Sequence, residues 1–303
     1  MPELPDVTVY VEALQARVKG QLLEGVRLAS PFVLRTFDPP IRAAAGKRVR
    51  EVSRLGKRIV FALDEELFLV VHLMIAGRFR WLERAAKLPG KLGLAALDFP
   101  DGTLVLTEAS KKRRASLHLV RGAGAVRAMD RGGIEPLEAS EEEFARALRD
   151  ENHTLKRSLT DPRLFSGIGN AYSDEILHRA RMSPAQLTKH LTDAQIATLF
   201  QATRTVLVEW TDRLRVEAAG GFPGKVTAFR PEMAVHGKFK EPCPVCGTAV
   251  QRIAYADNET NYCPRCQTEG RLLSDRSLAR LLKDDWPKTI EELEEKFPAK
   301  AQR

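Results

Sequence analysis

The first residues of the chain carry two groups that could do covalent chemistry. Met1 precedes the small residue Pro2, and an initiator Met in this context is usually removed, which would leave the secondary amine of Pro2 as the N-terminus. An α-amino group has a reference pKa of roughly 8, so a useful fraction is neutral and nucleophilic at neutral pH. Amines attack carbonyl carbons to form Schiff bases, and Glu3 could transfer the protons that this chemistry needs. The alternative is that Pro2 and Pro5 merely stiffen a frayed terminus.

Four cysteines form a second chemical centre near the other end of the chain. They are the only cysteines, and they lie as two Cys-x2-Cys pairs separated by sixteen residues: Cys243, Cys246, Cys263 and Cys266. This spacing is typical of a tetrahedral zinc site. Four thiolates fill the coordination sphere, so the sequence predicts one structural Zn²⁺ with no open position for catalysis. The alternative is a reduced cysteine cluster without a metal.

The overall composition limits the classes of protein to which the chain can belong. Its 303 residues suggest two domains with room for a small third unit, and 44% hydrophobic residues suffice for proper cores. Lys and Arg number 48 and Asp and Glu number 40, so the net charge of +8 favours a polyanionic partner. No apolar run approaches the roughly 18–20 residues of a membrane span. The first residues lack the basic region and long apolar core that are typical of a signal peptide, and the few clustered cysteines argue against a disulfide-rich secreted protein, so we expect an intracellular, cytoplasmic protein.

The elements that must position these groups can be predicted from periodicity. Residues 6–19 have apolar side chains at helical spacing and end at Gly20, which predicts a helix that anchors the N-terminus to a core. Residues 24–127 contain many short strands, among them 57–63, 66–73 and 77–83, and Asp101-Gly102 is a strong hairpin signal. We therefore expect a β-sandwich in the first part of the chain.

The second part of the chain is predicted to be helical up to about residue 217. Residues 130–137 have linker composition, and capping boxes at Ser140/Glu143 and Thr192/Gln195 predict helix starts. The turn at 167–170, Gly-Ile-Gly-Asn, would let backbone N–H groups approach a phosphate at a helix start; an ordinary glycine-rich turn is the alternative. Short helices are predicted at 274–283 and 289–296, the latter with a Thr289/Glu292 capping box. The acidic balance of 284–303 favours a packing or solvated role over DNA binding.

Four landmarks occur in the same order as in a known family. Pro2-Glu3-Leu4-Pro5, Gly56-Lys57, the Gly-Ile-Gly-Asn turn and the four cysteines resemble the formamidopyrimidine-DNA glycosylase / endonuclease VIII family, although Asp6 stands where that family usually has Glu. The resemblance implies an α+β multidomain fold: an N-terminal β-sandwich with an N-terminal helix, then a helical helix–two-turns–helix domain with a zinc finger. The expected boundaries are 1–130 for the catalytic β-sandwich, 131–230 for the helical domain, 231–270 for the finger and 271–303 for a helical extension.

The resemblance also assigns roles to individual residues. Lys57 would be the third catalytic residue beside Pro2 and Glu3, although a lone Lys at a strand start is more often an exposed edge residue. His72–Gly77 is similar to a family loop whose Met enters the gap left by a flipped base, which makes Met74 and Ile75 candidates for that position; the alternative is that both are core residues. The other implied DNA contacts are Lys112, Arg113 and Arg114, in a basic run lacking the family's Phe, together with Lys156, Asn170 and Asn258.

The function implied by the resemblance is a bifunctional DNA glycosylase/AP lyase of base excision repair. It would excise oxidised bases and cleave abasic sites by β,δ-elimination through a Schiff base on Pro2, with Zn²⁺ as the structural cofactor. The expected partner is damaged DNA, and we expect a monomer that associates with the nucleoid in a prokaryotic cytoplasm. The alternative is a non-catalytic DNA-binding or scaffolding protein that retains the fold. The sequence does not predict which lesion is preferred, nor whether duplex, single-stranded or branched DNA is favoured.

Overall fold

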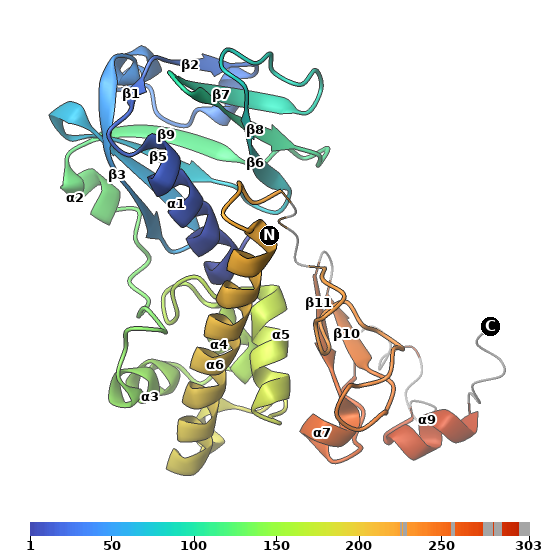
Figure 1. Ribbon diagram of the computed structural model, residues 1–303. Coiled ribbons are helices and arrows are strands. Elements are labelled where there is room, and N and C mark those ends of the chain that lie inside the picture. The colour runs from blue at the N-terminus through green and yellow to red at the C-terminus, as the bar shows by residue number, and fades with distance from the viewer. Residues whose placement is uncertain (225, 227–228, 256–257, 275–280, 282–286, 297–303) are drawn as a thin grey trace. The chain divides into compact units, whose positions relative to one another are not determined.

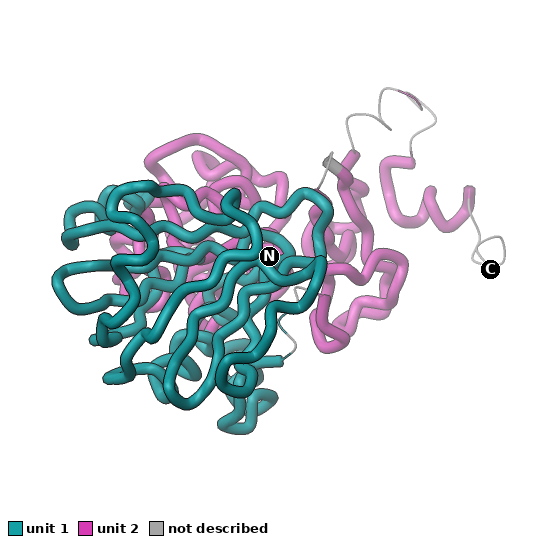
Figure 2. Tube along the Cα trace, turned by 90° about the horizontal axis from the view of Figure 1, so that it is seen from above, with its two compact units in different colours: residues 1–132, 208–228 teal, residues 133–207, 229–303 magenta. Residues whose placement is uncertain are grey.

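The computed structural model describes residues 1–224, 226, 229–255, 258–274, 281 and 287–296. The chain forms two compact units (Figure 2): residues 1–132 with 208–228 make unit 1, and residues 133–207 with 229–303 make unit 2. Most of the helix predicted at 274–283 lies outside the described residues.

Unit 1 is built from two antiparallel sheets, as the sequence predicts. The five-stranded sheet has the order β1 (Leu22–Leu23), β3 (Lys47–Leu55), β4 (Arg58–Leu63), β5 (Leu67–His72) and β9 (Ser116–Arg121). The four-stranded sheet has the order β2 (Gly25–Leu28), β7 (Gly93–Phe99), β8 (Gly102–Glu108) and β6 (Gly77–Leu82). The β7–β8 hairpin confirms the hairpin prediction, although its two-residue turn is Pro100-Asp101, because Gly102 already pairs with Phe99 as the first residue of β8. A short helix, α2 (Ala123–Arg127), follows β9.

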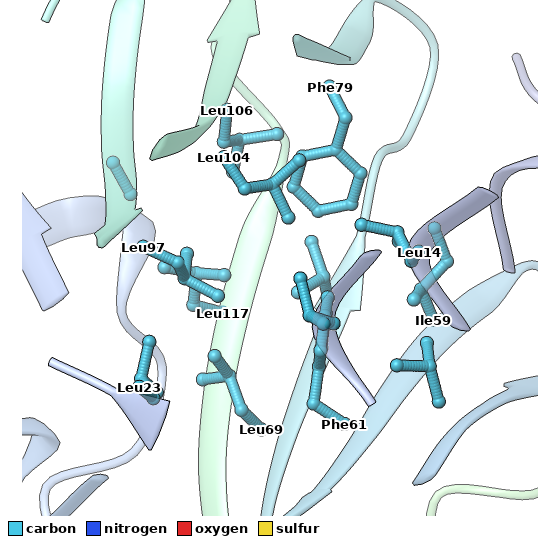
Figure 3. Packing of buried hydrophobic residues seen from close by; sticks show 14 of the residues in the cluster. Leu14, Leu23, Ile59, Phe61, Leu69, Phe79, Leu97, Leu104, Leu106 and Leu117 are labelled. Carbon is cyan, nitrogen blue, oxygen red and sulfur yellow. The ribbon is translucent and has the colours of Figure 1, made fainter. Parts of the chain in front are cut away.

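The hydrophobic core of unit 1 lies between these sheets (Figure 3). Phe61, Leu69 and Leu117 come from the five-stranded sheet, whereas Phe79 and Leu104 come from the four-stranded one. Alternate residues of an antiparallel strand point to opposite faces, so each sheet contributes one apolar face to the core. This closed core gives the loops at the strand ends a rigid base.

Helix α1 (Leu4–Val18) packs its apolar stripe into the same core. Pro5 lies in its first turn, where a missing N–H costs nothing, and the Asp6 carboxylate accepts the backbone N–H of Glu3 at 3.0 Å. The helix begins two residues earlier than predicted because these capping contacts include the N-terminal motif itself. Asp6 thus keeps the chain's N-terminus attached to a helix start.

Unit 2 begins with a group of helices. They are α3 (Glu141–Asp150), α4 (Leu155–Thr160), α5 (Asn170–Arg179) and the first part of α6 (Asp193–Ala218). Both predicted capping boxes are present: Ser140 N donates to Glu143 at 2.8 Å and Glu143 N to Ser140 Oγ at 3.2 Å, and Thr192 and Gln195 exchange the same pair at 3.0 and 3.2 Å. From Val208 onward the residues of α6 belong to unit 1.

The remainder of unit 2 is the finger and its extension (Figure 1). The finger has a hairpin of β10 (Gln251–Tyr255) and β11 (Asn258–Tyr262), followed by α7 (Pro264–Thr268). The described part of the extension contains α9 (Ile290–Lys296) and packs on the finger, since Ile290 is buried and its N–H donates to Gly270 O at 2.9 Å. The predicted Thr289/Glu292 box is half formed, because the Glu292 carboxylate accepts from Lys288 N instead of Thr289 N. None of the helices in the described ranges has the length and apolar character of a membrane span.

Candidate active site

Strand register brings three segments of unit 1 to one edge of the sandwich. Arg58 pairs with His72, and His72 pairs with Ser116, so the β3–β4 turn and the loops after β5 and before β9 meet there. In the other sheet Gly77 pairs with Glu108, which brings the start of β6 and the end of β8 to the same edge. This edge therefore gathers most of the unit 1 candidates: Lys57 in the β3–β4 turn, Met74, Ile75, Lys112, Arg113 and Arg114. Lys57 precedes the strand instead of starting it.

The N-terminus is held at this edge by α1. The Tyr10 hydroxyl donates to Phe79 O at 3.4 Å and accepts from Phe79 N at 3.2 Å, which ties α1 to β6. Pro2 is buried, and Glu3 is only 2% exposed. A catalytic amine needs such fixed surroundings because effective catalysis depends on placing the reacting atoms within a fraction of an ångström.

The electrostatic surroundings of the chain's amino group favour its neutral form. Burial lowers the pKa of this α-amino group below its ordinary value, and the nearby Glu3 carboxylate partly opposes the effect. The positive charges of Arg78 and Lys57 lower the pKa as well, whereas Asp6 raises it. Because Pro2 is itself buried, the same desolvation acts on the amine that removal of Met1 would produce. The amine is thus poised to act as a nucleophile near neutral pH.

The loop after β5 presents an apolar side chain to solvent. Gly77 N donates to Leu73 O at 2.8 Å and closes a tight turn in which Met74 has φ +52°. A Cβ on Gly77 would lie 2.2 Å from Leu73 O, so only glycine fits this turn. Ile75, at the tip, is 53% exposed, which is not a core position. Full burial of an Ile side chain contributes about 1.5–3 kcal/mol of free energy relative to exposure. An exposed Ile at the tip of this loop can gain that free energy by filling a gap in a bound partner.

The loop after β8 carries the basic run, and a buried carboxylate fixes its base. Glu108 is 2% exposed, and its two oxygens accept the N–H groups of Arg114 at 3.0 Å and Ala115 at 2.9 Å. Arg113 donates to Lys91 O at 2.5 Å. The four side chains of the run are exposed, so their charges face solvent at the same edge as the N-terminus: Lys111, Lys112, Arg113 and Arg114.

One titratable residue at this edge was not among the predicted site residues. Burial, together with the positive charges of Arg58 and Lys57, lowers the pKa of His72 to about 4, so its imidazole is neutral at physiological pH. His72 lies beside Lys57 and can offer an N–H donor without adding charge. The sequence signal was available, because His72 opens the motif from which Met74 and Ile75 were chosen.

In unit 2, the start of α5 gathers two further candidates around a buried acid. Lys156 Nζ donates to Asn170 O at 2.7 Å and to Asp174 Oδ1 at 2.5 Å, and its side chain is only 13% exposed. Asn170 Nδ2 donates to Glu259 O at 2.8 Å, so this side chain contacts the finger hairpin. Asn258 precedes Glu259 at the start of β11 and is exposed. The structure thus places Lys156, Asn170 and Asn258 close together, with the Lys charge balanced by Asp174.

The four cysteine sulfurs have the separations that a zinc ion requires. All four lie within 4.8 Å of one another, and the Cys243–Cys266 and Cys246–Cys263 distances are 3.9 and 3.4 Å. Zn–S bonds of about 2.3 Å in a tetrahedron place sulfurs about 3.8 Å apart. The donor set and its spacing therefore fit one structural Zn²⁺ bound by four thiolates, as predicted from the sequence.

Three family models match the chain in sequence order. They are the formamidopyrimidine-DNA glycosylase N-terminal domain over residues 1–125, the formamidopyrimidine-DNA glycosylase H2TH domain over 133–213, and a zinc finger found in FPG and IleRS over 240–268. The formamidopyrimidine-DNA glycosylase of Thermus thermophilus is 36% identical over 289 residues, covering 89% of this chain and 100% of the relative. That of Heliobacterium modesticaldum is 32% identical over 278 residues, covering 88% and 100%.

Solved structures with the same fold include Fpg proteins from two bacteria, one of them in complexes with DNA. The crystal structure of the Fpg protein from Thermus thermophilus superposes with a TM-score of 0.74 at 36% identity, covering 88% of this chain and 98% of that one. Lactococcus lactis Fpg in complex with DNA containing an abasic site gives 0.78 at 27% identity, covering 88% and 99%. Its complex with Fapy-dG-containing DNA gives 0.78 at 26%, covering 88% and 100%. With a 36% identical relative matched over its whole length, this chain belongs to the formamidopyrimidine-DNA glycosylase family.

Proposed function

We propose that this protein is a bifunctional DNA glycosylase/AP lyase of base excision repair. The observation that carries the proposal is the burial of Pro2 and Glu3 at the chain's N-terminus, where desolvation also lowers the pKa of the Met1 amino group. The substrate class is supported by relatives named formamidopyrimidine-DNA glycosylase, and by the Lactococcus lactis Fpg structures with Fapy-dG-containing and abasic-site-containing DNA. We expect a monomer that acts on damaged chromosomal DNA in a bacterial cytoplasm.

The chemistry follows from the two N-terminal residues. A damaged nucleotide is flipped out of the stack, and the Pro2 nitrogen attacks C1′ as the bond to the base breaks. Glu3 donates a proton to the ring oxygen as the sugar opens, which leaves a Schiff base between Pro2 and C1′. This cation acidifies the C2′–H, and loss of that proton expels the 3′ phosphate. A second elimination expels the 5′ phosphate, and water then releases the sugar remnant from Pro2.

The remaining candidates would hold the DNA. The exposed Ile75, with Met74 beside it, would fill the gap that the flipped base leaves, and the run that includes Lys112, Arg113 and Arg114 would contact phosphates. In unit 2, Asn170 and Asn258 would contact phosphates near Lys156. Zn²⁺ would hold the finger in shape and take no part in bond breaking.

The test of this proposal is product analysis on defined duplexes. We expect release of a formamidopyrimidine or oxidised base, and single-nucleotide gaps with phosphates at both ends when the substrate has an abasic site. A protein that binds these duplexes but neither releases a base nor cleaves the abasic strand would overturn the enzymatic proposal and favour the non-catalytic alternative.

The lowered amine pKa makes a prediction about pH dependence. Only the neutral amine attacks, so the rate of Schiff-base formation should rise with pH and level off once pH exceeds the amine pKa. Because burial lowers that pKa, the plateau should be reached below the roughly 8 of an unperturbed α-amino group. Single-turnover borohydride trapping on abasic DNA between pH 5 and 9 measures this midpoint. A midpoint at or above about 8 would show that desolvation does not act on the catalytic amine.

The finger makes a separate prediction about the strength of DNA binding. Asn258 is exposed next to the Asn170 contact, and its amide side chain brings no charge to the finger. Asn258→Arg should tighten binding to undamaged and lesion DNA alike, and should steepen the slope of log affinity against log salt by about 0.9. Val245→Arg adds the same charge at another exposed position of the finger and should leave the slope unchanged. Equal slopes for wild type and Asn258→Arg would mean that position 258 does not face phosphate.

A further inference from the structure

One face of α5 contacts the finger at regular intervals. Asn170, Asp174 and His178 are four residues apart, so they form a single stripe along the helix. Asn170 donates to Glu259 O at 2.8 Å, and Asp174 contacts His236 Nδ1 at 2.8 Å. His178, in the last turn, has its Nε2 3.3 Å from Cys243 Sγ. Only the last of these three contacts involves a zinc ligand.

The contact between His178 and Cys243 is buried and is well shaped for a hydrogen bond. His178 is 6% exposed and Cys243 is 2% exposed, so water cannot substitute for either partner. A zinc-bound thiolate has no proton to donate, so the proton of this bond must be on Nε2. Four thiolates around one Zn²⁺ carry a net charge of −2, and a buried negative charge needs N–H donors around it.

We propose that His178 is a positioning residue for the zinc site: its Nε2–H donates to the Cys243 thiolate, stabilises bound zinc and couples the metal to the helix that carries Asn170. The alternative role is simple space filling between α5 and the finger. The proposal concerns the metal site alone, so it stands or fails independently of glycosylase activity.

Two substitutions in the full-length protein separate donation from packing. His178→Phe keeps a flat ring but removes the donor, whereas His178→Gln is smaller but keeps an N–H. Loss of a hydrogen-bond partner of a metal ligand typically costs about 10–100-fold in metal affinity. We therefore expect His178→Phe to weaken zinc binding, measured by competition with a chromogenic chelator, by about 10–100-fold, with His178→Gln substantially closer to wild type. His190→Phe, which alters an exposed histidine, should behave as wild type.

A spectroscopic readout tests the hydrogen bond directly. In the Co²⁺-substituted protein, loss of an N–H donor raises the energy of the sulfur lone pairs, so the sulfur-to-cobalt charge-transfer band should move to longer wavelength in His178→Phe. Unchanged zinc affinity and band position in His178→Phe would overturn the proposal, as would equal weakening in both variants with no band shift. If His178→Phe does not fold, the ¹⁵N chemical shifts of His178 in the wild-type zinc protein decide: a protonated Nε2 supports the proposal, and an unprotonated Nε2 overturns it.

Discussion

Borohydride should trap the wild-type protein covalently on abasic DNA, and Pro2→Ala should trap poorly. The substitution keeps an N-terminal amine, but it loses the rigid ring and the basicity of a secondary amine. An uncleaved residue placed before Pro2 should abolish trapping altogether, because the nitrogen then becomes an amide. Gel electrophoresis of the reduced complex measures the yield.

Pro5→Ala is the matched control for this experiment. It removes a proline from the same motif, in the first turn of α1, but leaves the amine of Pro2 unchanged. We expect it to trap at close to the wild-type level. Equal trapping by wild type and Pro2→Ala would show that the ring is dispensable, and absence of trapping by the wild type would remove the basis of the Schiff-base mechanism.

Glu3→Gln should separate the two halves of the reaction. A positioned general acid typically contributes about 10²–10⁴-fold, so base release should fall by that factor. Cleavage of a preformed abasic site should fall less, because the sugar is already partly open to attack. Base release from lesion duplexes and strand cleavage of abasic duplexes are measured side by side for wild type and Glu3→Gln, which gives the loss of rate on each substrate. Similar losses on both substrates would show that Glu3 is not the proton donor for base excision.

Removing zinc should unfold the finger and leave unit 1 intact. Among the residues that the structure describes, the buried apolar cluster around the cysteines contains only Val235 and Val250 besides the cysteines themselves. Burial of these two side chains contributes about 3–6 kcal/mol to the free energy of folding. Ordering a backbone costs about 1–2 kcal/mol per residue, whereas structural zinc supplies about 10–16 kcal/mol. Cys246→Ser should therefore lose stable zinc binding, expose the finger to proteolysis and weaken DNA binding.

The neighbouring Val245→Ser serves as the control for the cysteine substitution. Val245 is 58% exposed and is not a zinc ligand, so the Val245→Ser protein should retain one zinc per chain and full DNA affinity. Elemental analysis measures the zinc content, limited proteolysis measures the exposure of the finger to protease, and binding titrations measure the DNA affinity. A folded, protease-resistant finger in zinc-free protein would show that the metal is not what holds this segment together.

Some features of this fold could be predicted from the sequence because they depend only on interactions between residues a few positions apart. The β7–β8 hairpin could be predicted because turn residues signal it locally, although its turn lies at Pro100-Asp101, one residue before the predicted Asp101-Gly102. The Ser140/Glu143 capping box needs only a spacing of three residues. The zinc site follows the same logic, since each Cys-x2-Cys pair places two thiolates on one tight turn.

The parts of the site that could not be predicted from the sequence depend on contacts between residues far apart in the chain. The resemblance makes Lys156 a candidate DNA contact, yet its partner Asp174 could not be inferred, because the pairing depends on how α4 and α5 pack. The His178–Cys243 contact spans 65 positions and has no spacing signature. At the edge of unit 1, strand register explains why Lys57 and Ile75 come together, and register across the sandwich cannot be read from single strands.

The hydrogen bonds of Glu108 to the base of the basic loop have a consequence for the free energy of binding to a partner. Its carboxylate holds the backbone of Arg114 and Ala115 before any partner arrives. Fixing a free backbone costs about 1–2 kcal/mol per residue, so restraint of these two residues spares a binding event roughly 2–4 kcal/mol of ordering entropy. A mobile lysine-rich tail of equal charge would have to order itself on each encounter. The basic loop is therefore pre-organised, and its affinity should depend on shape as well as on charge.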